Sequence, residues 1–363
     1  MKTLFIANLK LNANEGIYKK IYAEATAIGN TVGDCTLVMP NFNTSIMINT
    51  KDKISLESDK DVLKTAKRLI LENDINLIYI RLMIPSFELY LLLKLAYMNK
   101  IKILYEIPTY PYYNEQFRAS RKKYRAVVKI CIDIFFSPII KKYADKIVVI
   151  KSKSKIKMHP KMIEITNGIN TDPIIPKNYK NDSNSVFRMV AIGTLYSYHG
   201  YDRILKGLKK CDEKIDGIPI EFHIIGESQT INELNQQTKK LKLKRVFFHG
   251  LKTTEELNDM FELFDVGLGC LALHRRNADI DTTLKIIEYY CRGIPVVTSG
   301  ISPYKDNRVT IRIPDNNDAV KIEDIYYWWK DIDKTVLEKL SVNAKKQFDW
   351  NIIMSNLIEQ CYI

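Results

Sequence analysis

Apolar and polar residues alternate along the first half of the chain in blocks that have the spacing of strands and helices. Short apolar runs with strand character lie at 4–7, 76–80, 101–107 and 145–150. Segments with apolar residues at helical spacing lie between them, from about 17, at 62–71, at 87–98 and in one long helix from about 115. Because strands that alternate with helices usually pair in parallel, the pattern predicts an α/β fold with helices on both faces of a parallel sheet.

The same alternation starts again after a polar segment at 171–185, which is rich in Pro, Asn, Asp and Ser. Strand-type runs follow at 186–193, 220–225, 246–250, 266–271 and 294–297. Helical segments lie between them, from about 201, at 253–264 and at 284–291. A chain of 363 residues is long enough for two domains that each bury a core. We therefore predict one α/β domain at 1–170 and a second at 171–347.

The helix expected at 284–291 has clear signals at both ends. Asp281, Thr282 and Thr283 offer side-chain oxygens where the first N–H groups of a helix need acceptors. Gly293 follows the last apolar residue of the helical pattern and is expected to end the helix.

Three cations surround the start of this helix. Lys285 lies in its first turn, and Arg275 and Arg276 lie in the loop that leads to it. Cations are disfavoured near the positive end of a helix dipole unless an anion binds there, so the arrangement suggests a phosphate site. The alternative is that all three are solvated, with Glu288 pairing Lys285 and Arg292 on an exposed face.

The surrounding stretch, 265–299, resembles the donor-binding segment of the retaining GT-B glycosyltransferases that use nucleotide sugars. This large group 1 family includes capsule and O-antigen assembly enzymes. The matching pieces lie at 265–266, 273–275, 284–289 and 292–297. The resemblance implies that Glu288 binds the nucleotide ribose and that Lys285 reaches the diphosphate.

The resemblance also implies a GT-B fold, in which two Rossmann-like domains face each other across a cleft. It implies transfer of a sugar from a UDP- or GDP-linked donor, with retention of configuration and without a metal or other cofactor. Cations and helix N–H groups must then stabilise the departing diphosphate. We expect this role for Lys285, Arg275, Arg276 and the amides of Thr282 and Thr283.

Further matches to the family extend over most of the chain. The turn at Asn167-Gly168 resembles the end of the first domain, and the aromatic segment from Phe348 resembles the one that crosses back onto that domain. A helix at about 348–363 is therefore assigned to the first domain. Gly193 is expected to contact the donor, and Gly16 is expected to let the backbone approach substrates or to form a plain turn.

The sequence departs from the family pattern at two places. Thr194 and His199 stand where the family usually has an arginine and a lysine for the diphosphate. His199 is still expected in the donor site. The family also carries a glutamate eight residues before the ribose-binding one, and Ile280 occupies that position. Asp279 and Asp281 flank it and are candidates to replace the missing carboxylate.

In the first domain, the strand at 101–107 leads into a polar and aromatic segment. Glu106, Thr109 and Tyr110 lie where the ends of parallel strands line a ligand crevice, so they are candidates for acceptor or sugar contacts. We place Glu106 among the catalytic candidates. The alternative is that the two prolines only stiffen a turn.

The net charge of +13 lies entirely in the first domain. Residues 1–170 hold 28 basic and 15 acidic residues, whereas residues 171–363 hold 27 of each. A basic stripe with an apolar side is expected along the helix from about 115, formed by Arg118, Arg121, Lys122, Arg125 and Lys129. It could bind an anionic membrane surface or the pyrophosphate of a lipid-linked acceptor, or its charges could simply be solvated.

Other classes of protein lack support in the sequence. The six cysteines show no C-x-x-C spacing, and the five histidines show no metal-type pair. No nucleic-acid-binding motif accompanies the basic residues. No apolar run reaches membrane-spanning length and the first residues lack the features of a signal peptide, so a cytoplasmic protein on the inner face of the cell membrane is expected.

These observations predict a metal-independent glycosyltransferase that moves a sugar from a nucleotide sugar to a glycan acceptor, with a lipid-linked acceptor favoured, in cell-surface polysaccharide assembly. The alternative is a catalytically inactive GT-B partner or chaperone subunit of another glycosyltransferase. The replaced arginine and lysine and the missing first glutamate favour the alternative, whereas Lys285 and Glu288 favour the enzyme.

Overall fold

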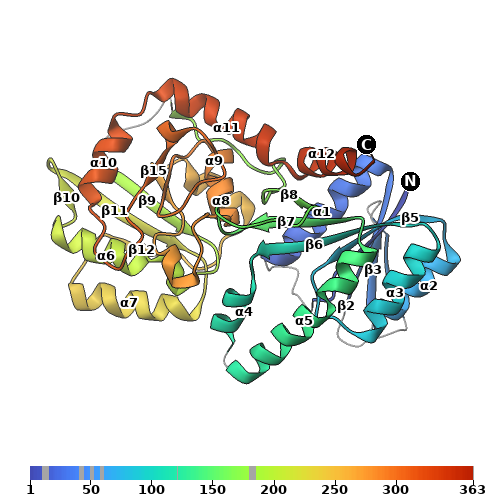
Figure 1. Ribbon diagram of the computed structural model, residues 1–363. Coiled ribbons are helices and arrows are strands. Elements are labelled where there is room, and N and C mark those ends of the chain that lie inside the picture. Colours follow the sequence, from blue (N-terminus) through green and yellow to red (C-terminus); the bar gives the residue numbers. More distant parts are fainter. Residues whose placement is uncertain are drawn as a thin grey trace. The chain divides into compact units, whose positions relative to one another are not determined.

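The computed structural model describes residues 1–9, 16–40, 45–49, 53–57, 61–120, 122–179 and 185–362. The chain forms two compact units (Figure 1). Unit 1 consists of Met1–Lys151, Lys155–Thr166 and Trp350–Ile363, and unit 2 consists of Ser152–Ser154 and Asn167–Asp349. Both units are layered α/β structures, as the alternation of strands and helices predicts.

Unit 1 is built on an eight-stranded sheet with the order β4-β3-β2-β1-β5-β6-β7-β8. Its strands are β1 (Lys2–Ile6), β2 (Asp34–Pro40), β3 (Ser45–Asn49), β4 (Lys53–Glu57), β5 (Ile75–Arg81), β6 (Lys102–Tyr110), β7 (Lys146–Lys151) and β8 (Met162–Glu164). From β2 to β8 the neighbours pair in parallel, which confirms the expected parallel sheet. The antiparallel strands β3 and β4, which extend the sheet beyond β2, were not predicted.

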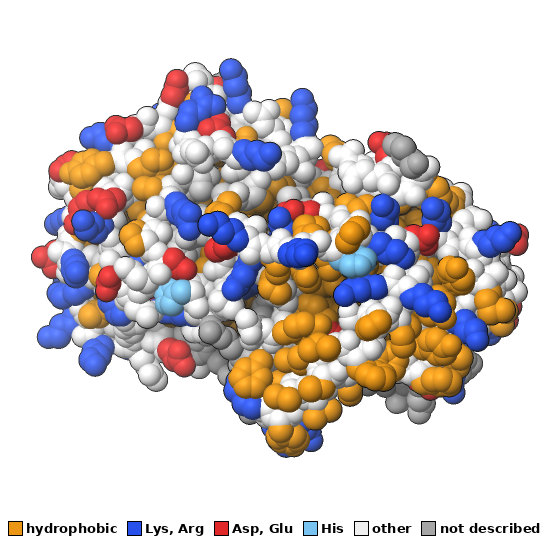
Figure 2. Space-filling model, viewed as in Figure 1, with side chains coloured by type: hydrophobic (Ala, Val, Ile, Leu, Met, Phe, Trp, Pro, Cys, Tyr) orange, Lys and Arg blue, Asp and Glu red, His pale blue; other side chains and the backbone are white. Residues whose placement is uncertain are grey.

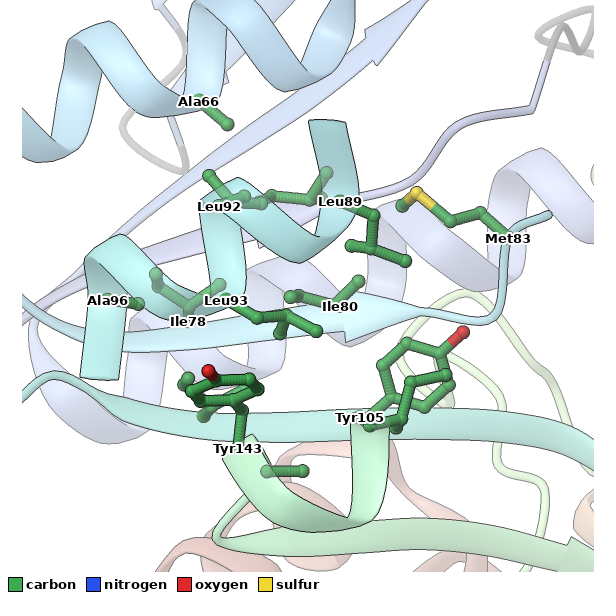
Figure 3. Packing of buried hydrophobic residues seen from close by; sticks show 14 of the residues in the cluster. Ala66, Ile78, Ile80, Met83, Leu89, Leu92, Leu93, Ala96, Tyr105 and Tyr143 are labelled. Atoms are coloured by element: carbon green, nitrogen blue, oxygen red, sulfur yellow. The ribbon is translucent and has the colours of Figure 1, made fainter. Parts of the chain in front are cut away.

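Helices cover both faces of this sheet. They are α1 (Gly16–Val32), α2 (Val62–Glu72), α3 (Phe87–Met98), α4 (Tyr113–Ala119), α5 (Lys123–Tyr143) and α12 (Trp350–Tyr362). Side chains from α2, α3 and α5 form one core with one face of the sheet (Figure 3). Side chains from α1 and α12 form a second core on the other face. Successive β5 residues therefore enter different cores, Ile78 and Ile80 the first and Leu77 and Tyr79 the second, which explains why this strand is apolar throughout.

The single long helix expected from about 115 is wrong, because the chain breaks it into α4 and α5. Ser120 and Lys122 have extended backbone conformations, and the Ser120 hydroxyl donates a hydrogen bond to the carbonyl of Lys122 (3.0 Å). Serine competes in this way with helix hydrogen bonds through its side chain. Arg118 lies on α4, whereas Arg125 and Lys129 lie on α5, so the described cations belong to two helices; Arg121 lies outside the described residues.

Unit 2 contains a seven-stranded sheet with the order β10-β11-β9-β13-β14-β15, and β12 pairs with β11. Its strands are β9 (Phe187–Ile192), β10 (Lys214–Ile215), β11 (Ile218–Ile225), β12 (Val246–Phe248), β13 (Val266–Leu268), β14 (Val296–Thr298) and β15 (Thr310–Arg312). All pairs except β10 with β11 are parallel.

The helices of unit 2 also lie on both faces of its sheet. They are α6 (Tyr201–Lys210), α7 (Gln229–Leu241), α8 (Thr254–Phe261), α9 (Leu284–Cys291), α10 (Ile322–Lys330) and α11 (Lys334–Phe348). Short 3-10 helices within the described residues include η2 (Ser197–His199), η3 (Leu273–Arg276) and η4 (Asn307–Val309). The predicted helix at 284–291 is confirmed as α9, and Gly293 follows it with φ +80°, a conformation that favours glycine.

None of the helices in the described part of the chain has the length and hydropathy of a membrane-spanning segment.

Candidate functional site

The candidate site lies in unit 2, where the carboxyl end of β9 and the N-terminus of α9 are tied to the loop that contains η2. Gly193, directly after β9, is exposed with φ +97° and donates its N–H to the carbonyl of Ile225 (3.0 Å). Gly226, which follows β11, donates its N–H to the carbonyl of Gly250, which follows β12 (2.8 Å). Three neighbouring strand ends are thus joined by backbone hydrogen bonds, at the edge of a parallel sheet where ligands usually bind.

The close packing of these strand ends makes Gly226 sensitive to substitution. Its φ is +132°, and a Cβ added there would lie 2.2 Å from the carbonyl oxygen of Gly193. We expect Gly226→Ala to cost about 1–3 kcal/mol of unfolding free energy, through backbone strain and displacement of Gly193. Urea denaturation checks this. Gly217→Ala is the control, because Gly217 has φ +78° with nothing within 4 Å of the added Cβ, and an equal loss there would rule out the contact with Gly193 as the cause.

Lys285 occupies the first turn of α9, and its ammonium group is buried. Its Nζ lies 3.1 Å from the hydroxyl of Tyr201 and 3.3 Å from Nδ1 of His199. It also lies 5.3 Å from the centre of the Tyr201 ring. None of these partners in the described part of the chain is a carboxylate. Burial lowers the pKa of Lys285 to about 8, against the opposing influence of Cys270 and Asp281. A buried ammonium that is hydrogen-bonded only to neutral groups among the described residues is costly, and a bound anion would stabilise it.

His199 is buried beside Lys285 and accepts a hydrogen bond at Nδ1 from the N–H of Tyr196 (3.1 Å). Burial lowers its pKa well below the usual value, and the charges of Lys285 and Arg276 lower it further. His199 is therefore a neutral imidazole near pH 7. Because Nδ1 accepts, Nε2 carries the hydrogen and can donate it. Although His199 stands at the family's lysine position, it supplies a hydrogen-bond donor and not a cation.

Arg276 stays near this site. Its guanidinium lies 5.0 Å from the centre of the Tyr198 ring, and its charge contributes to the lowered pKa of His199. Tyr198 in turn stacks on Tyr196, with ring centres 5.3 Å apart. Arg276 and Lys285 thus both place positive charge beside His199.

Arg275 has a different environment, and its expected role at the diphosphate needs correction. Its Nη1 and Nη2 bind both carboxylate oxygens of Asp202, at 2.8 and 3.0 Å. Burial raises the pKa of Asp202, but the hydrogen bonds and charge of Arg275 together with the charge of Lys206 lower it further than burial raises it, so the net shift is downward. Arg275 also donates to the carbonyl of Ser197 and to Asn317. Its charge is neutralised within the protein, and it connects η2, η3 and α6.

Asp281 is fully buried and binds only protein groups, so it does not replace the glutamate missing at 280. Its Oδ1 accepts from the N–H and hydroxyl of Thr283, at 3.2 and 2.7 Å. Its Oδ2 accepts from the N–H of Cys270 and the hydroxyl of Thr298, at 2.7 and 2.9 Å. The Thr283 amide is therefore occupied, which corrects its expected role at the diphosphate. Thr282 is half-buried, and its carbonyl accepts from the side chain of Asn167.

The carboxylate of Asp279 also accepts hydrogen bonds from groups of the protein. Its two carboxylate oxygens accept from the N–H and the hydroxyl of Ser154, at 2.7 and 2.9 Å. The N–H groups of Asp279 and Ile280 both donate to the carbonyl of Ser152, and Lys153 donates to Asn277 (3.0 Å). Asp281 is thus closed to a sugar by burial, whereas Asp279 is half-buried and held by Ser154. The role of segment 152–154 was missed, because nothing in its sequence names a partner that lies 125 residues away.

Glu288 lies on α9 and pairs with Arg292 and not with Lys285. Its Oε1 accepts from Nη2 of Arg292 at 2.9 Å, and the side chains of Glu288 and Arg292 are 24% and 1% exposed. The alternative of a solvated ion-pair network that includes Lys285 is therefore wrong, since both cations are buried.

In unit 1, Glu106 is fully buried, and its expected contact with a substrate needs correction. Its carboxylate pairs with Arg81 at 2.9 Å and with Lys20 at 3.5 Å. The same two cations pair with Glu24, at 3.2 and 3.4 Å. Burial raises the pKa of Glu24 to about 7, and the charge of Glu106 raises it as well. Two carboxylates thus share two cations inside the unit.

The remaining predicted residues of unit 1 lie on its surface or outside the described residues. Gly16 begins α1 and is exposed, but the loop before it, 10–15, is not among the described residues. Arg121 and the side chain of Arg118 are also outside them. Lys122, Arg125 and Lys129 are exposed. Figure 2 shows apolar side chains gathered over α5, and the exposed ones are Tyr124, Val127, Val128, Ile134 and Phe135.

The two parallel-sheet units define a GT-B protein, and solved structures of this class resemble the whole chain. One is sucrose-phosphate synthase from Thermosynechococcus elongatus, with 12% sequence identity, a TM-score of 0.68 and coverage of 99% of this chain and 98% of that one. Another is HepE from Anabaena in complex with UDP, with 12% identity, a TM-score of 0.66 and coverage of 100% and 99%. A third is WaaG, a glycosyltransferase involved in lipopolysaccharide biosynthesis, with 10% identity, a TM-score of 0.62 and coverage of 99% of both chains.

The family assignment agrees with the fold. Residues 186–326 match the family "Glycosyl transferases group 1", and the chain thus carries a group 1 glycosyltransferase domain in unit 2. The match includes Gly193, His199, Arg276, Lys285 and Glu288, and it supports a glycosyltransferase function. No curated protein matches the sequence.

Proposed function

We propose that this protein transfers a sugar from a nucleoside-diphosphate donor to a glycan acceptor, with retention of configuration. The observation that carries the proposal is the buried ammonium group of Lys285 at the N-terminus of α9, whose hydrogen-bond partners among the described residues, His199 and Tyr201, are both neutral. A diphosphate would supply the missing negative charge and would also accept hydrogen bonds from the helix terminus. The complexes of HepE with UDP and with UDP-glucose support a donor of this type.

The proposed chemistry depends on charge at the leaving group. As the glycosidic bond to the donor breaks, negative charge grows on the diphosphate and positive charge on the sugar. Lys285 and Arg276 stabilise the diphosphate, and Nε2–H of His199 donates a hydrogen bond to it. In this proposal these groups take the place of a metal ion. Gly193, which has no side chain at the exposed end of β9, lets the donor approach the backbone.

Glu288 binds the ribose in this proposal. Its Oε1 is held by Arg292, and its side chain is partly exposed. A carboxylate oxygen is a strong acceptor for ribose hydroxyls. Glu288 and Lys285 are three residues apart on α9, so one helix would supply the contacts to both the ribose and the diphosphate.

We further propose a lipid-linked acceptor and a position on the inner face of the cell membrane, in polysaccharide assembly. The support is the exposed basic group formed by Lys122, which precedes α5, and by Arg125 and Lys129 on α5, together with the apolar side chains of this helix (Figure 2). Cations and apolar groups on one helix suit an anionic lipid surface. The role of WaaG in lipopolysaccharide biosynthesis agrees with an acceptor of this kind.

A non-catalytic partner subunit is the second candidate. Ile280 stands in place of the first glutamate, and both neighbouring aspartates accept hydrogen bonds from groups of the protein. A chain that had lost its donor would be free to lose this carboxylate. The buried charge of Lys285 favours the enzyme, because an unused buried cation would only destabilise the fold.

Calorimetry with UDP, GDP, CDP and ADP tests the proposal. We expect one of them to bind at micromolar concentration and Glu288→Ala to weaken that binding by about 10- to 100-fold, as loss of a charged hydrogen bond does. Glu323→Ala, a change at an acidic residue in the first turn of α10, is the control and should bind like the wild type. A folded wild type that binds none of the four nucleotides would contradict the enzyme and favour the partner subunit.

A further inference from the structure

Glu288 and Arg292 form an ion pair that uses only one of the two carboxylate oxygens. Nε and Nη2 of Arg292 both donate to Oε1 of Glu288, at 3.1 and 2.9 Å. Arginine often binds a carboxylate through both oxygens, but here both hydrogen bonds end on the same one. Within the described part of the chain, Oε2 has no hydrogen-bond partner. The pair therefore keeps one oxygen of a partly exposed carboxylate open to a ligand.

Arg292 is itself fixed by groups that do not touch Glu288. Its Nη1 donates to Oδ1 of Asn258 at 2.7 Å, and its guanidinium lies 4.3 Å from the centre of the Phe261 ring. Both of these side chains come from α8. Nδ2 of Asn258 donates to the carbonyl of Pro173 at 3.1 Å, so Asn258 cannot turn without losing a second hydrogen bond. The guanidinium thus has a defined position, and it sets the position of the glutamate.

We propose that Arg292 is a positioning residue that holds Glu288 in the orientation that binds the ribose of the donor. This inference rests on the proposed function, because the ribose is part of the proposed ligand. A free glutamate on a helix surface samples several rotamers and must lose that freedom when a ligand binds. In this protein Arg292 has already removed the freedom, so binding of the nucleoside is stronger.

The arrangement also separates phosphate binding from ribose binding within the site. Lys285 has no contact with Glu288 or Arg292 among its hydrogen bonds and would serve the phosphates alone. Arg292 acts only through Glu288 and therefore on the ribose hydroxyls alone. A change at Arg292 should alter the affinity for nucleosides while leaving the affinity for a bare diphosphate intact.

This separation gives the test. Wild type, Arg292→Met, Arg292→Lys and Asn258→Ala are titrated with the best-binding nucleoside diphosphate, with its 2′,3′-dideoxy analogue and with inorganic pyrophosphate. We expect Arg292→Met to lower the affinity for the nucleoside diphosphate about tenfold or more. The affinity for pyrophosphate should change by less than about twofold. The dideoxy analogue should bind the variant and the wild type almost equally. Arg292→Lys and Asn258→Ala should lower the affinity for the nucleoside diphosphate by a smaller factor, again without changing the affinity for pyrophosphate. These two variants provide the test if Arg292→Met does not fold.

Three results would overturn the proposal. Equal weakening of nucleoside diphosphate and pyrophosphate would show that Arg292 only supports the fold of the unit. Unchanged affinity for the nucleoside diphosphate would show that Glu288 does not need it. If the wild type bound pyrophosphate but did not distinguish the nucleotide from its dideoxy analogue, the ribose role of Glu288 would fall, and the inference with it. If it bound none of the ligands, the proposed function itself would fail.

Discussion

Replacing Lys285 with methionine is expected to stabilise the protein at neutral pH and at the same time to weaken nucleotide binding strongly. The ammonium group is buried with neutral partners, and its pKa is lowered to about 8 from the model-compound value of 10.5. A shift of this size corresponds to a destabilisation of about 3 kcal/mol when the lysine is charged. Methionine fills a similar volume without a charge, so the variant should gain free energy of unfolding while losing the contact to the diphosphate.

The stability difference between Lys285→Met and the wild type should change with pH in a defined direction. Below pH 8 the lysine is protonated in both the folded and the unfolded protein, so the full destabilisation is present. Between about pH 8 and pH 10.5 the unfolded chain binds more protons than the folded one, so the stability contributed by this group rises with pH. The advantage of Lys285→Met over the wild type should therefore be largest at pH 7 and should shrink towards pH 10.

Urea denaturation at pH 7 and pH 10, together with calorimetry at pH 7, measures both effects. We expect the nucleotide affinity to fall by about 100-fold in Lys285→Met, in line with the loss of a desolvated charge pair. Lys240→Met, a change at an exposed lysine of α7, is the control and should alter neither property. A variant that is less stable than the wild type at pH 7 would show that Lys285 already has adequate partners in the folded protein.

Glu106→Gln is expected to lower the free energy of unfolding of the protein by about 3–5 kcal/mol, because it leaves two buried cations with one carboxylate. Arg81 and Lys20 both pair with Glu106 and with Glu24, and all four side chains are at most 6% exposed. Glutamine keeps the shape but not the charge, so the loss measures the ion pairs and not a cavity.

Glu72→Gln provides the matched control on the surface of the same unit. Glu72 pairs with Arg68 at 3.2 Å, but the two side chains are 53% and 40% exposed. Solvent screening should limit this change to less than about 1 kcal/mol. If Glu106→Gln kept the stability of the wild type but lost transferase activity, the cluster would not be structural and Glu106 would return to the catalytic candidates.

The N-terminus of α9 shows what could be predicted from the sequence. The apolar spacing located the helix start, because it is a local property of neighbouring residues, but the expected capping is wrong, since the N-cap residue Thr283 makes no side-chain capping hydrogen bond. Resemblance to the family then named Lys285 and Glu288 in unit 2, where the structure places both on α9. The parallel order of most strands was predicted for the same reason, since it follows from the alternation of elements along the chain.

Pairing partners that are distant in sequence could not be predicted. Arg275 was assigned to the diphosphate, but Asp202 lies 73 residues earlier and neutralises it. Glu106 was placed at a strand end, but Arg81 lies 25 residues earlier, and Lys20 comes from α1. The sequence shows how many charges a region carries, whereas the topology decides which of them meet. The break between α4 and α5 was missed for another reason, since a serine hydroxyl competed with a helix hydrogen bond.

The short segment 152–154 has a consequence for how the protein can be divided. Its hydrogen bonds to Asp279 and Ile280 hold the loop that leads into α9, although the neighbouring residues 151 and 155 belong to unit 1. A gene fragment cut at the linear boundary, between 166 and 167, would encode unit 2 without this segment. Neither unit is a contiguous piece of the polypeptide, because unit 1 also requires α12 from the other end. Fusion, domain exchange and fragment expression should therefore treat the two units as interleaved parts and keep residues 152–154 with unit 2.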